Sequence, residues 1–474
     1  MINPKNFTIQ TEVSPAYHDQ ILDFIYKYYL FPQNDVFEDI KKNKFRGQNN
    51  LSFVFKDKNN ITGTIEGRIW SGDEIKVSFN PQGDVSSDSL NQLAEDIFIV
   101  VQLFEENIRK STIYFAWVEG QKIIPEKPPS VRKKASKRLF GSGMLLLYVL
   151  FFGVNIILFI FLGFYAVIFI LLIQMVIVLL SDKIYMKMGD WKITPENPKV
   201  HIIQYQIPEK DFKFFRENFG ENILFKIKKE IYDASLALGK SPTCDLGEEV
   251  LSKYGMHCIP SMRSSKVINV YEIIKKASEL FDIPIPKIVV SNNMLPNAAA
   301  TGPSPKRGLV LITTGLLVQL NEEEILSVIG HEMGHLKGRD PLILFSLISG
   351  EFILRLTILF PLVIISPLIY IFVAMGLIFF VAKFFEARAD LLSAKVIGSP
   401  QVLAEALRKI GYQKLQFERM RSYKISSWAL WDPHPPIYFR IKRLENLKNA
   451  DKISSPLLKS AKDVINGFKD SFRS

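Results

Sequence analysis

The chain has 474 residues, of which 48% are hydrophobic, and it carries a formal net charge of +11 at pH 7. Its mean hydropathy of +0.12 is high for a soluble protein and indicates membrane segments. A nucleic-acid partner is not expected, because the sequence has no basic motif with interleaved aromatic residues and no finger spacing. Attraction to an anionic membrane surface is the simpler interpretation of the basic charge.

Residues 1–130 are expected to form a soluble α/β domain with an unknown partner. Met1–Gln10 is polar, so no signal peptide is expected there. Helices are predicted over Ala16–Leu30 and Ser89–Arg109 from their apolar spacing. Alternating apolar residues between turn signals predict four strands, over Leu51–Lys56, Ile61–Ile69, Glu74–Phe79 and Thr112–Val118. No catalytic constellation is found in this part.

A basic linker and an apolar tract follow. Residues 131–138 contain Arg132, Lys133, Lys134, Lys137 and Arg138, and a basic cluster beside an apolar tract favours a membrane-surface anchor. Residues 139–180 are 42 residues without Asp, Glu, Lys or Arg. Because one spanning helix needs about 20 residues, this length predicts a transmembrane hairpin with a turn near Gly163. One long kinked helix is the alternative.

Residues 181–340 are again soluble in character. Strands are predicted over Val200–Gln206, Lys287–Ser291 and Arg307–Thr313, and helices over Lys210–Glu217, Asn222–Leu238 and Tyr271–Phe281. Between the last two strands lie Asn297, Ala298, Ala299 and Ala300. Small residues on an edge strand leave room for an extended peptide to add a strand. A tight strand without a ligand is the alternative that spacing alone favours.

The sequence His331-Glu332-Met333-Gly334-His335 has the pattern HExxH, in a segment predicted to be helical from Glu322 to Gly338. Residues four apart share one helical face, so His331 and His335 can point two imidazoles at one ion. Glu332 can reach the same centre as a general base. This is the arrangement of a zinc metalloprotease, and it predicts one Zn²⁺ per chain.

A second apolar tract separates this motif from a further carboxylate pair. Residues 341–382 predict another transmembrane hairpin, with Pro361 and Pro367 near the turn. Its charges, Glu351 and Arg355, stand four apart and can pair. Two spans return the chain to the side from which it left. Basic residues flanking both tracts place that side in the cytoplasm of a multi-pass cell-membrane protein.

The third zinc ligand is expected downstream, because a catalytic zinc has three protein ligands and one open position. Glu386 and Asp390 lie four apart in residues 383–474. Glu386 is predicted to bind the metal, and Asp390 to accept the second ring N–H of a ligand histidine. A solvated carboxylate pair is the alternative.

HExxH followed by E-x-x-A-D after apolar segments resembles the membrane zinc metalloproteases of the HtpX and CAAX prenyl endoprotease family. The resemblance implies that residues 297–300 line the substrate groove. It also covers Asp432-Pro433-His434-Pro435-Pro436 and Arg440. His434 would then stabilise the oxyanion, and Arg440 would hold carboxylates or the substrate backbone. Four spans fit HtpX better than the CAAX endoproteases. Residues 1–138 have no counterpart in that family.

The predicted fold is a mainly α-helical integral membrane metalloprotease with about four transmembrane helices in two hairpins. It adds a zincin-like catalytic domain with a small sheet and the N-terminal soluble α/β domain. The expected function is hydrolysis of polypeptides, by resemblance misfolded or damaged membrane proteins, on the cytoplasmic side of the lipid bilayer. Two alternatives stay open: a processing protease with a defined, for example prenylated, substrate, and a metal-stabilised membrane sensor or scaffold. The basic, amphipathic residues 452–474 are consistent with an interfacial helix.

Overall fold

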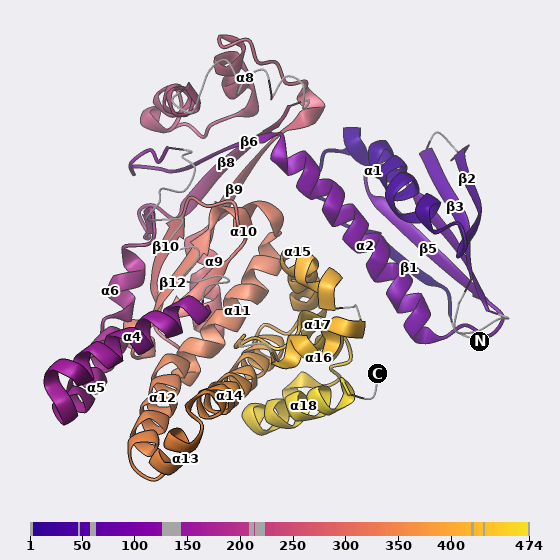
Figure 1. Cartoon of the computed structure of the whole chain (residues 1–474). Coiled ribbons are helices and arrows are strands. Elements are labelled where there is room, and N and C mark those ends of the chain that lie inside the picture. The colour runs from indigo at the N-terminus through magenta and orange to yellow at the C-terminus, as the bar shows by residue number, and fades with distance from the viewer. Residues whose placement is uncertain are drawn as a thin grey trace. The chain divides into compact units, whose positions relative to one another are not determined.

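The structure is a computed structural model that describes residues 3–45, 48–56, 63–125, 144–207, 223–418, 421–429 and 432–472, together with Lys213. The chain divides into two compact units. The first contains residues 1–115 and 201–266, and the second contains residues 116–200 and 267–474. Figure 1 shows the elements of both units along the chain. The basic linker, residues 131–138, and the helix expected over Lys210–Glu217 (except Lys213) lie outside the described residues.

The first unit is built on an antiparallel sheet in the order β1-β5-β4-β3-β2. Its strands are β1 (Lys5–Ile9), β2 (Phe37–Phe45), β3 (Gln48–Lys56), β4 (Thr64–Trp70) and β5 (Ile75–Gln82). Helices α1 (His18–Ile25) and α2 (Ser87–Lys110) share one apolar core with the sheet. The alternating burial of β4 and β5 explains why their periodicity was readable in the sequence, whereas β1 and the basic β2 were not predicted.

Residues 201–266 group with this first unit, whereas the sequence analysis placed them with the catalytic region. The phenol of Tyr17 lies 3.3 Å from the sulfur of Met262, and Ser14 donates a hydrogen bond to the carbonyl of Ser261. A helix, α8 (Cys244–Ser252), belongs to this segment. A three-stranded sheet has the order β6-β8-β9. Each boundary between the residues of the first unit and those of the second falls within one of these strands. These strands are β6 (Thr112–Val118), β8 (Lys199–Gln206) and β9 (Arg263–Asn269).

The second unit contains a four-stranded sheet in the order β11-β12-β10-β7. Strands β10 (Lys287–Ser291) and β12 (Leu309–Thr313) are parallel, and β11 (Ala298–Thr301) and β7 (Trp191–Ile193) pair antiparallel at the edges. Helices α9 (Val270–Phe281), α10 (Thr314–Gln319) and α11 (Glu322–Gly338) accompany the sheet. Helix α11 has the bounds predicted for the HExxH helix. Helix α11 begins three residues after the end of α10, the short helix that follows β12.

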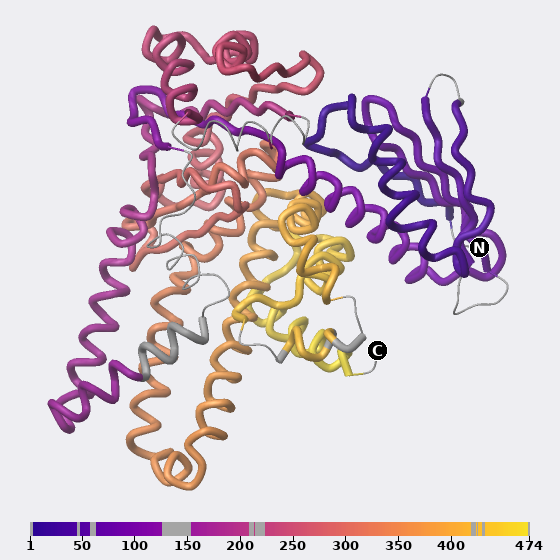
Figure 2. The backbone as a smooth tube through the Cα atoms, turned by 45° about the horizontal axis from the view of Figure 1, so that its top comes forward, coloured from indigo at the N-terminus to yellow at the C-terminus, as the bar shows by residue number. Residues whose placement is uncertain are grey.

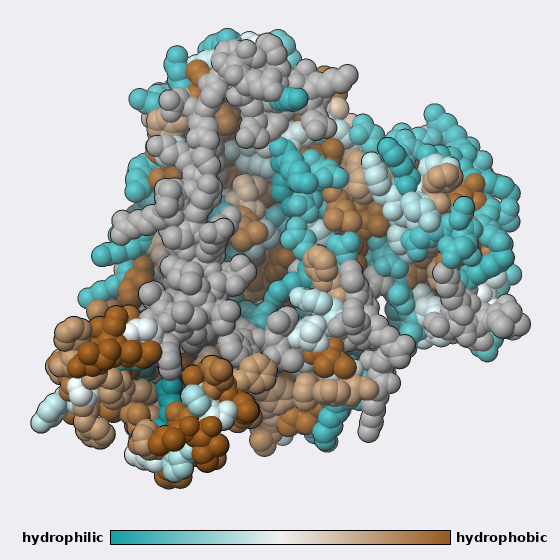
Figure 3. All heavy atoms as spheres, in the orientation of Figure 1, coloured by the Kyte–Doolittle hydropathy of each residue, from teal (hydrophilic) through white to brown (hydrophobic). Residues whose placement is uncertain are grey.

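Two helical hairpins project from the same end of this unit (Figure 2). The first contains α4 (Met144–Leu162) and α5 (Ala166–Leu179), joined at Gly163, whose φ of 53° makes the expected turn. The second contains α12 (Asp340–Leu356), α13 (Phe360–Ile365) and α14 (Pro367–Val396). Gly153–Leu179 and Pro367–Val396 are long and apolar enough to cross a membrane. Figure 3 shows apolar surface gathered over the hairpins.

Polar contacts connect the two hairpins, and others connect residues within the second hairpin. Ser349 of α12 donates a hydrogen bond of 3.3 Å to Gln174 of α5, and both side chains are buried. Glu351 and Arg355 form the expected pair at 3.4 Å, and the hydroxyl of Tyr370 donates to Glu351 at 2.8 Å. Because buried polar groups in an apolar environment need partners, these contacts stabilise the helix packing.

Among the residues that the structure describes after α14, four α-helices lie beside α11 and α14 or pack on one another. They are α15 (Pro400–Glu418), α16 (Arg421–Ala429), α17 (Ile437–Glu445) and α18 (Pro456–Asp470). Trp428 of α16 packs with Val464 of α18 and Ala387 of α14 in one buried cluster. The segment between α16 and α17 carries His434. These helices therefore bring the C-terminal motif to the helix that carries Glu386.

Candidate active site

Helix α11 is defined at both ends by local interactions. Asn321 accepts the backbone N–H of Glu324, and the Glu324 carboxylate accepts the backbone N–H of Asn321, which is a capping box. The helix ends at Arg339, whose φ of 54° is left-handed. Between these ends His331 and His335 occupy one face, one turn apart. The capped helix therefore fixes the spacing of the two imidazoles.

Glycines allow α14 to approach α11 closely. A Cβ atom on Gly334 would lie 3.1 Å from the Cα of Ala389, and one on Gly330 would lie 2.8 Å from the Oγ of Ser393. Both glycines lie on the face of α11 that meets α14, four residues apart. Their missing side chains let the backbones approach, and Glu386 of α14 reaches the imidazoles of α11 as a result.

Three donor atoms converge at this helix crossing. The Nε2 atoms of His331 and His335 are 3.2 Å apart. Glu386 places Oε1 3.3 Å from Nε2 of His335 and Oε2 3.5 Å from Nε2 of His331. Two ligands with bonds of 2.0–2.1 Å at a tetrahedral angle are about 3.3 Å apart. Among the described residues no hydrogen bond reaches Oε2 of Glu386, which is buried. The donor set therefore fits a tetrahedral zinc ion.

The second ring nitrogen of His331 faces a buried carboxylate. Its Nδ1 lies 2.9 Å from Oδ1 of Asp390, where the sequence analysis predicted such a contact. Arg440 binds Asp390 through two hydrogen bonds, of 2.9 Å from Nε and 2.7 Å from Nη2. Arg440 is only 6% exposed, so its buried position fits the expected role of holding a carboxylate rather than the substrate backbone.

His335 has an equivalent partner that the sequence analysis missed. Its Nδ1 lies 2.7 Å from Oδ2 of Asp340, and Arg388 contacts Oδ1 of Asp340 at 2.5 Å. The left-handed Arg339 turns the chain so that Asp340 faces back toward the histidine. In the sequence Asp340 lies directly before Pro341, between the HExxH helix and the second apolar tract. Each of the two histidines thus carries its own aspartate and arginine.

These carboxylates determine the charge at the two imidazoles. Burial alone would lower the pKa of His331, but the nearby carboxylates of Asp390 and Glu386 raise it above its ordinary value. The pKa of His335 is raised further, because Glu386 and Asp340 outweigh its burial. The surroundings of both rings therefore favour positive charge at this centre, which suits a divalent cation.

Glu332 lies between the metal ligands and the sheet edge. Its Oε2 accepts a hydrogen bond of 2.7 Å from the backbone N–H of Ala300 in β11. Within the described residues β11 is an edge strand, paired only with β12. Asn297 precedes the strand and donates its N–H to Thr313 at 2.9 Å, while Ala298 and Ala299 are half-buried within it. The four residues predicted to contact substrate thus lie at an edge beside Glu332.

His434 approaches the centre from the C-terminal segment. Its Nε2 lies 3.6 Å from Oε2 of Glu386, and its side chain is 47% exposed. Its Nδ1 lies 2.8 Å from Oδ1 of Asp432, which also pairs with Lys414 at 2.6 Å. Burial opposes ionisation of Asp432, yet His434 and Lys414 hold the pKa of this carboxyl well below its usual range. Asp432 was not predicted as a site residue, although it lies two residues before His434.

Two of the basic residues that follow the second apolar tract, Lys383 and Arg388, are buried in the site. Lys383 donates a hydrogen bond to the backbone carbonyl of Asp432, and Arg388 pairs with Asp340. Neither can interact with lipid headgroups. Exposed basic residues at this end of the hairpins include Lys183, Lys187, Lys337 and Arg339.

Comparison with known proteins agrees with this geometry. Residues 265–448 match the model of Peptidase family M48. A protease HtpX homolog of Caldanaerobacter subterraneus is 30% identical over 37% of this chain and 71% of its own length. One of Thermococcus sibiricus is 30% identical over 37% of this chain and 73% of its own length. One of Thermodesulfovibrio yellowstonii is 29% identical, over 41% and 80% respectively. The chain with this His-His-Glu centre therefore belongs to peptidase family M48, with HtpX-like proteases as its relatives.

Proposed function

We propose that this metallopeptidase is an integral-membrane zinc endopeptidase that cuts misfolded or damaged membrane proteins on the cytoplasmic side. The observation that carries the proposal is the convergence of His331, His335 and Glu386 beside a carboxylate, Glu332, held at a sheet edge. The separations of 3.2, 3.3 and 3.5 Å between the three donors suit the bond lengths of zinc. The donor types, two imidazoles and one carboxylate, also favour zinc.

His331, His335 and Glu386 would hold the ion, and Asp390 and Asp340 would fix the orientation of the two rings. When bound, zinc supplies Lewis-acid chemistry, which acidifies water and polarises a carbonyl group. Arg440 and Arg388 hold the two supporting carboxylates, of Asp390 and Asp340, in place.

The protein groups then account for the proton transfers. Glu332 takes a proton from the water molecule whose oxygen attacks the scissile carbonyl carbon, and later gives it to the nitrogen as the C–N bond breaks. His434 donates a hydrogen bond from Nε2 to the oxyanion. A substrate strand along β11 would use the same sheet edge that holds Glu332 through Ala300. Zinc binding and catalysis thus use different carboxylates, Glu386 and Glu332.

The cytoplasmic orientation is supported by the exposed basic residues Lys183, Lys187, Lys337 and Arg339 at the site end of the hairpins. The bilayer is supported by the exposed apolar side chains of both hairpins, among them Phe161, Phe164, Ile365 and Leu368. Membrane-protein substrates are supported by the position of Glu386 on α14, the helix that belongs to the second hairpin. The N-terminal unit is proposed to bind a partner of its own.

The test is cleavage of an unfolded model protein by the detergent-purified chain, with and without a chelator, beside the Glu332→Gln variant. We expect metal-dependent cleavage, and a variant that retains one zinc per chain but does not cleave. Cleavage by the variant would contradict the mechanism. Sequencing the products distinguishes quality control, with many scattered sites, from processing at one C-terminal site. Zinc binding without any cleavage would favour the sensor or scaffold.

A further inference from the structure

Helix α18 crosses α14 at the level where the exposed apolar surface of α14 ends. Large apolar side chains of α14 are exposed as far as Leu377, and the side chains of Ile378 and Phe379 are buried. Phe380 then packs against Phe468 of α18, with ring centroids 5.5 Å apart. Three residues of a helix span about 4.5 Å. Helix α18 therefore lies within one helical turn of the point where α14 leaves its apolar band.

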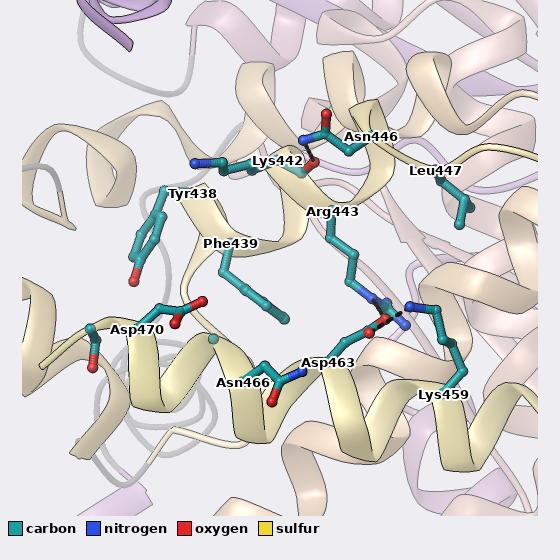
Figure 4. A pocket seen from close by; sticks show the side chains of 12 residues that line it. Tyr438, Phe439, Lys442, Arg443, Asn446, Leu447, Lys459, Asp463, Asn466 and Asp470 are labelled. Carbon is teal, nitrogen blue, oxygen red and sulfur yellow. Dashed lines mark hydrogen bonds and ion pairs between the residues drawn. The ribbon is translucent and has the colours of Figure 1, made fainter. Parts of the chain in front are cut away.

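Two sides of α18 are occupied by the protein. Ser460 and Val464 are buried on the side that meets α14. A second side faces α17 across a cavity of about 430 Å³ (Figure 4). There Asp463 pairs with Arg443 of α17 at 2.9 Å and with Lys459 at 2.7 Å. The acidic side chains of the helix, Asp463 and Asp470, both line this cavity.

The third side of α18 carries an exposed apolar stripe. Leu458, Ile465 and Phe472, which follows the helix end, are 72%, 38% and 60% exposed. They are seven residues apart, a spacing that keeps them on one face of a helix. Lys462 and Lys469 are also exposed, are also seven residues apart and border the stripe. The stripe points away from the cavity side, and so away from α17.

We infer that α18 lies on the bilayer surface, with its apolar stripe at the boundary between headgroups and acyl chains. The occupant of the stripe is lipid because α18 contacts α14 at the level where the exposed apolar surface of α14 ends, and Figure 3 shows that apolar surface gathered over the hairpins. Lys462 and Lys469 lie where their ammonium groups meet anionic phosphates. An apolar face bordered by lysines is the pattern of helices that lie in a membrane interface.

The contact reaches the catalytic centre through Arg443. Its guanidinium binds Asp463 and Ser460 of α18 and donates a hydrogen bond of 2.6 Å to the carbonyl of Ala387, the residue after Glu386. Lipid contact by α18 thus holds the ligand-bearing part of α14 at a fixed height above the bilayer. The inference rests on the proposed insertion of the hairpins and does not depend on peptidase activity.

The test introduces the photoreactive residue p-benzoylphenylalanine into the full chain, reconstituted in vesicles of phosphatidylcholine and phosphatidylglycerol. One position is Ile465 in the stripe, a second is Leu368 in the exposed apolar part of α14, and the matched control is Asn466, which lines the cavity side. After irradiation, mass spectrometry detects lipid adducts. We expect adducts at Ile465 and Leu368 and none at Asn466.

Each other outcome overturns the inference. Adducts at Leu368 without adducts at Ile465 would leave the hairpins in the bilayer but remove α18 from it. A crosslink at Ile465 to a second copy of the chain would assign the stripe to a protein interface. No adduct at either position would overturn the membrane insertion of the hairpins as well. Reversing charge with Lys462→Glu and Lys469→Glu should lower the adduct yield at Ile465 at least roughly fivefold.

Discussion

The Oδ2 atom of Asp340 lies 2.7 Å from Nδ1 of His335, and so repeats for the second histidine what Asp390 does for the first. Both carboxylates are buried and each is bound by an arginine. A carboxylate at Nδ1 fixes the tautomer that leaves Nε2 free to bind a metal. The two aspartates come from different helices, α12 and α14. Each end of the His-His pair is therefore oriented separately.

Replacing Asp340 with Asn should weaken zinc binding about 10- to 100-fold, because outer partners of ligand histidines contribute to affinity on that scale. Zinc competition against a chromogenic chelator measures the effect, and excess zinc should restore part of the activity. Asp390→Asn is the matched comparison at His331. Unchanged zinc affinity in both variants would show that the aspartates support the fold and not the metal site.

Asp432 should control the orientation of His434. With Asp432→Asn we expect kcat to fall roughly tenfold or more, with zinc content and KM unchanged, because Nδ1 loses its anionic acceptor. His434→Ala should cost roughly 100-fold in kcat, as for loss of an oxyanion donor. The double variant should be no worse than His434→Ala alone. Losses that multiply in the double variant would mean that the two residues act independently.

The crossing of α11 and α14 should tolerate no side chain at Gly334. Gly334→Ala places a Cβ 3.1 Å from the Cα of Ala389, and overpacking of this kind costs about 1–3 kcal/mol. We expect lower thermal stability and weaker zinc binding together. Gly350→Ala in α12 is the control, because nothing lies within 4 Å of its added Cβ. If both variants bind zinc alike, the close approach is not what sets the site.

Glu418 should make stability depend on pH. Burial is the main cause that raises the pKa of its carboxyl from 4.5 to about 7, although its Oε2 accepts the backbone N–H of Tyr438. A carboxyl protonated in the folded state and ionised in the unfolded state destabilises the fold as pH rises from about 4.5 to 7, by up to about 3 kcal/mol. Below pH 4.5 this effect is absent, and above pH 7 it is constant.

The Glu418→Gln variant isolates this contribution. Relative to the unmodified chain, the variant should gain unfolding free energy between pH 5 and pH 8, because its side chain stays neutral throughout. Thermal unfolding in detergent at both pH values measures the difference. A difference between the two proteins that is the same at both pH values would contradict the assignment to Glu418.

Local sequence patterns were sufficient where the structure itself is local. The bounds of α11 follow from one capping residue and an apolar period, and the turn at Gly163 follows from the length of the apolar tract. The metal cluster of His331, His335 and Glu386 was predicted because two ligands share a helix turn and the third had to lie downstream. The role of His434 was predicted only from the resemblance to the HtpX-like proteases.

Other parts depend on contacts between distant segments. Asp340 contacts His335 only because Arg339 adopts a left-handed conformation. No spacing rule predicts that conformation from the sequence. The role of Gly334 in the helix packing could not be predicted from the sequence, because it depends on Ala389, a residue distant in the chain that packs against it. Short strands such as β7 have too few residues to show the alternation of apolar and polar side chains that predicts a strand. Residues 201–266 group with the first unit and not with their neighbours in the chain, because packing and not chain order decides which unit a segment joins.

With the hairpins inserted as proposed, the end of the exposed apolar surface at Leu377 would also set a minimum loop length for membrane-protein substrates. Glu386 follows nine residues later, so the metal site would lie at most about 14 Å above that level. An extended chain needs about four residues to climb this distance and four to return. Four more would pair with β11. We therefore expect intact helical hairpins with tight turns to be out of reach, whereas a protein whose helices have separated offers segments of about a dozen residues or more.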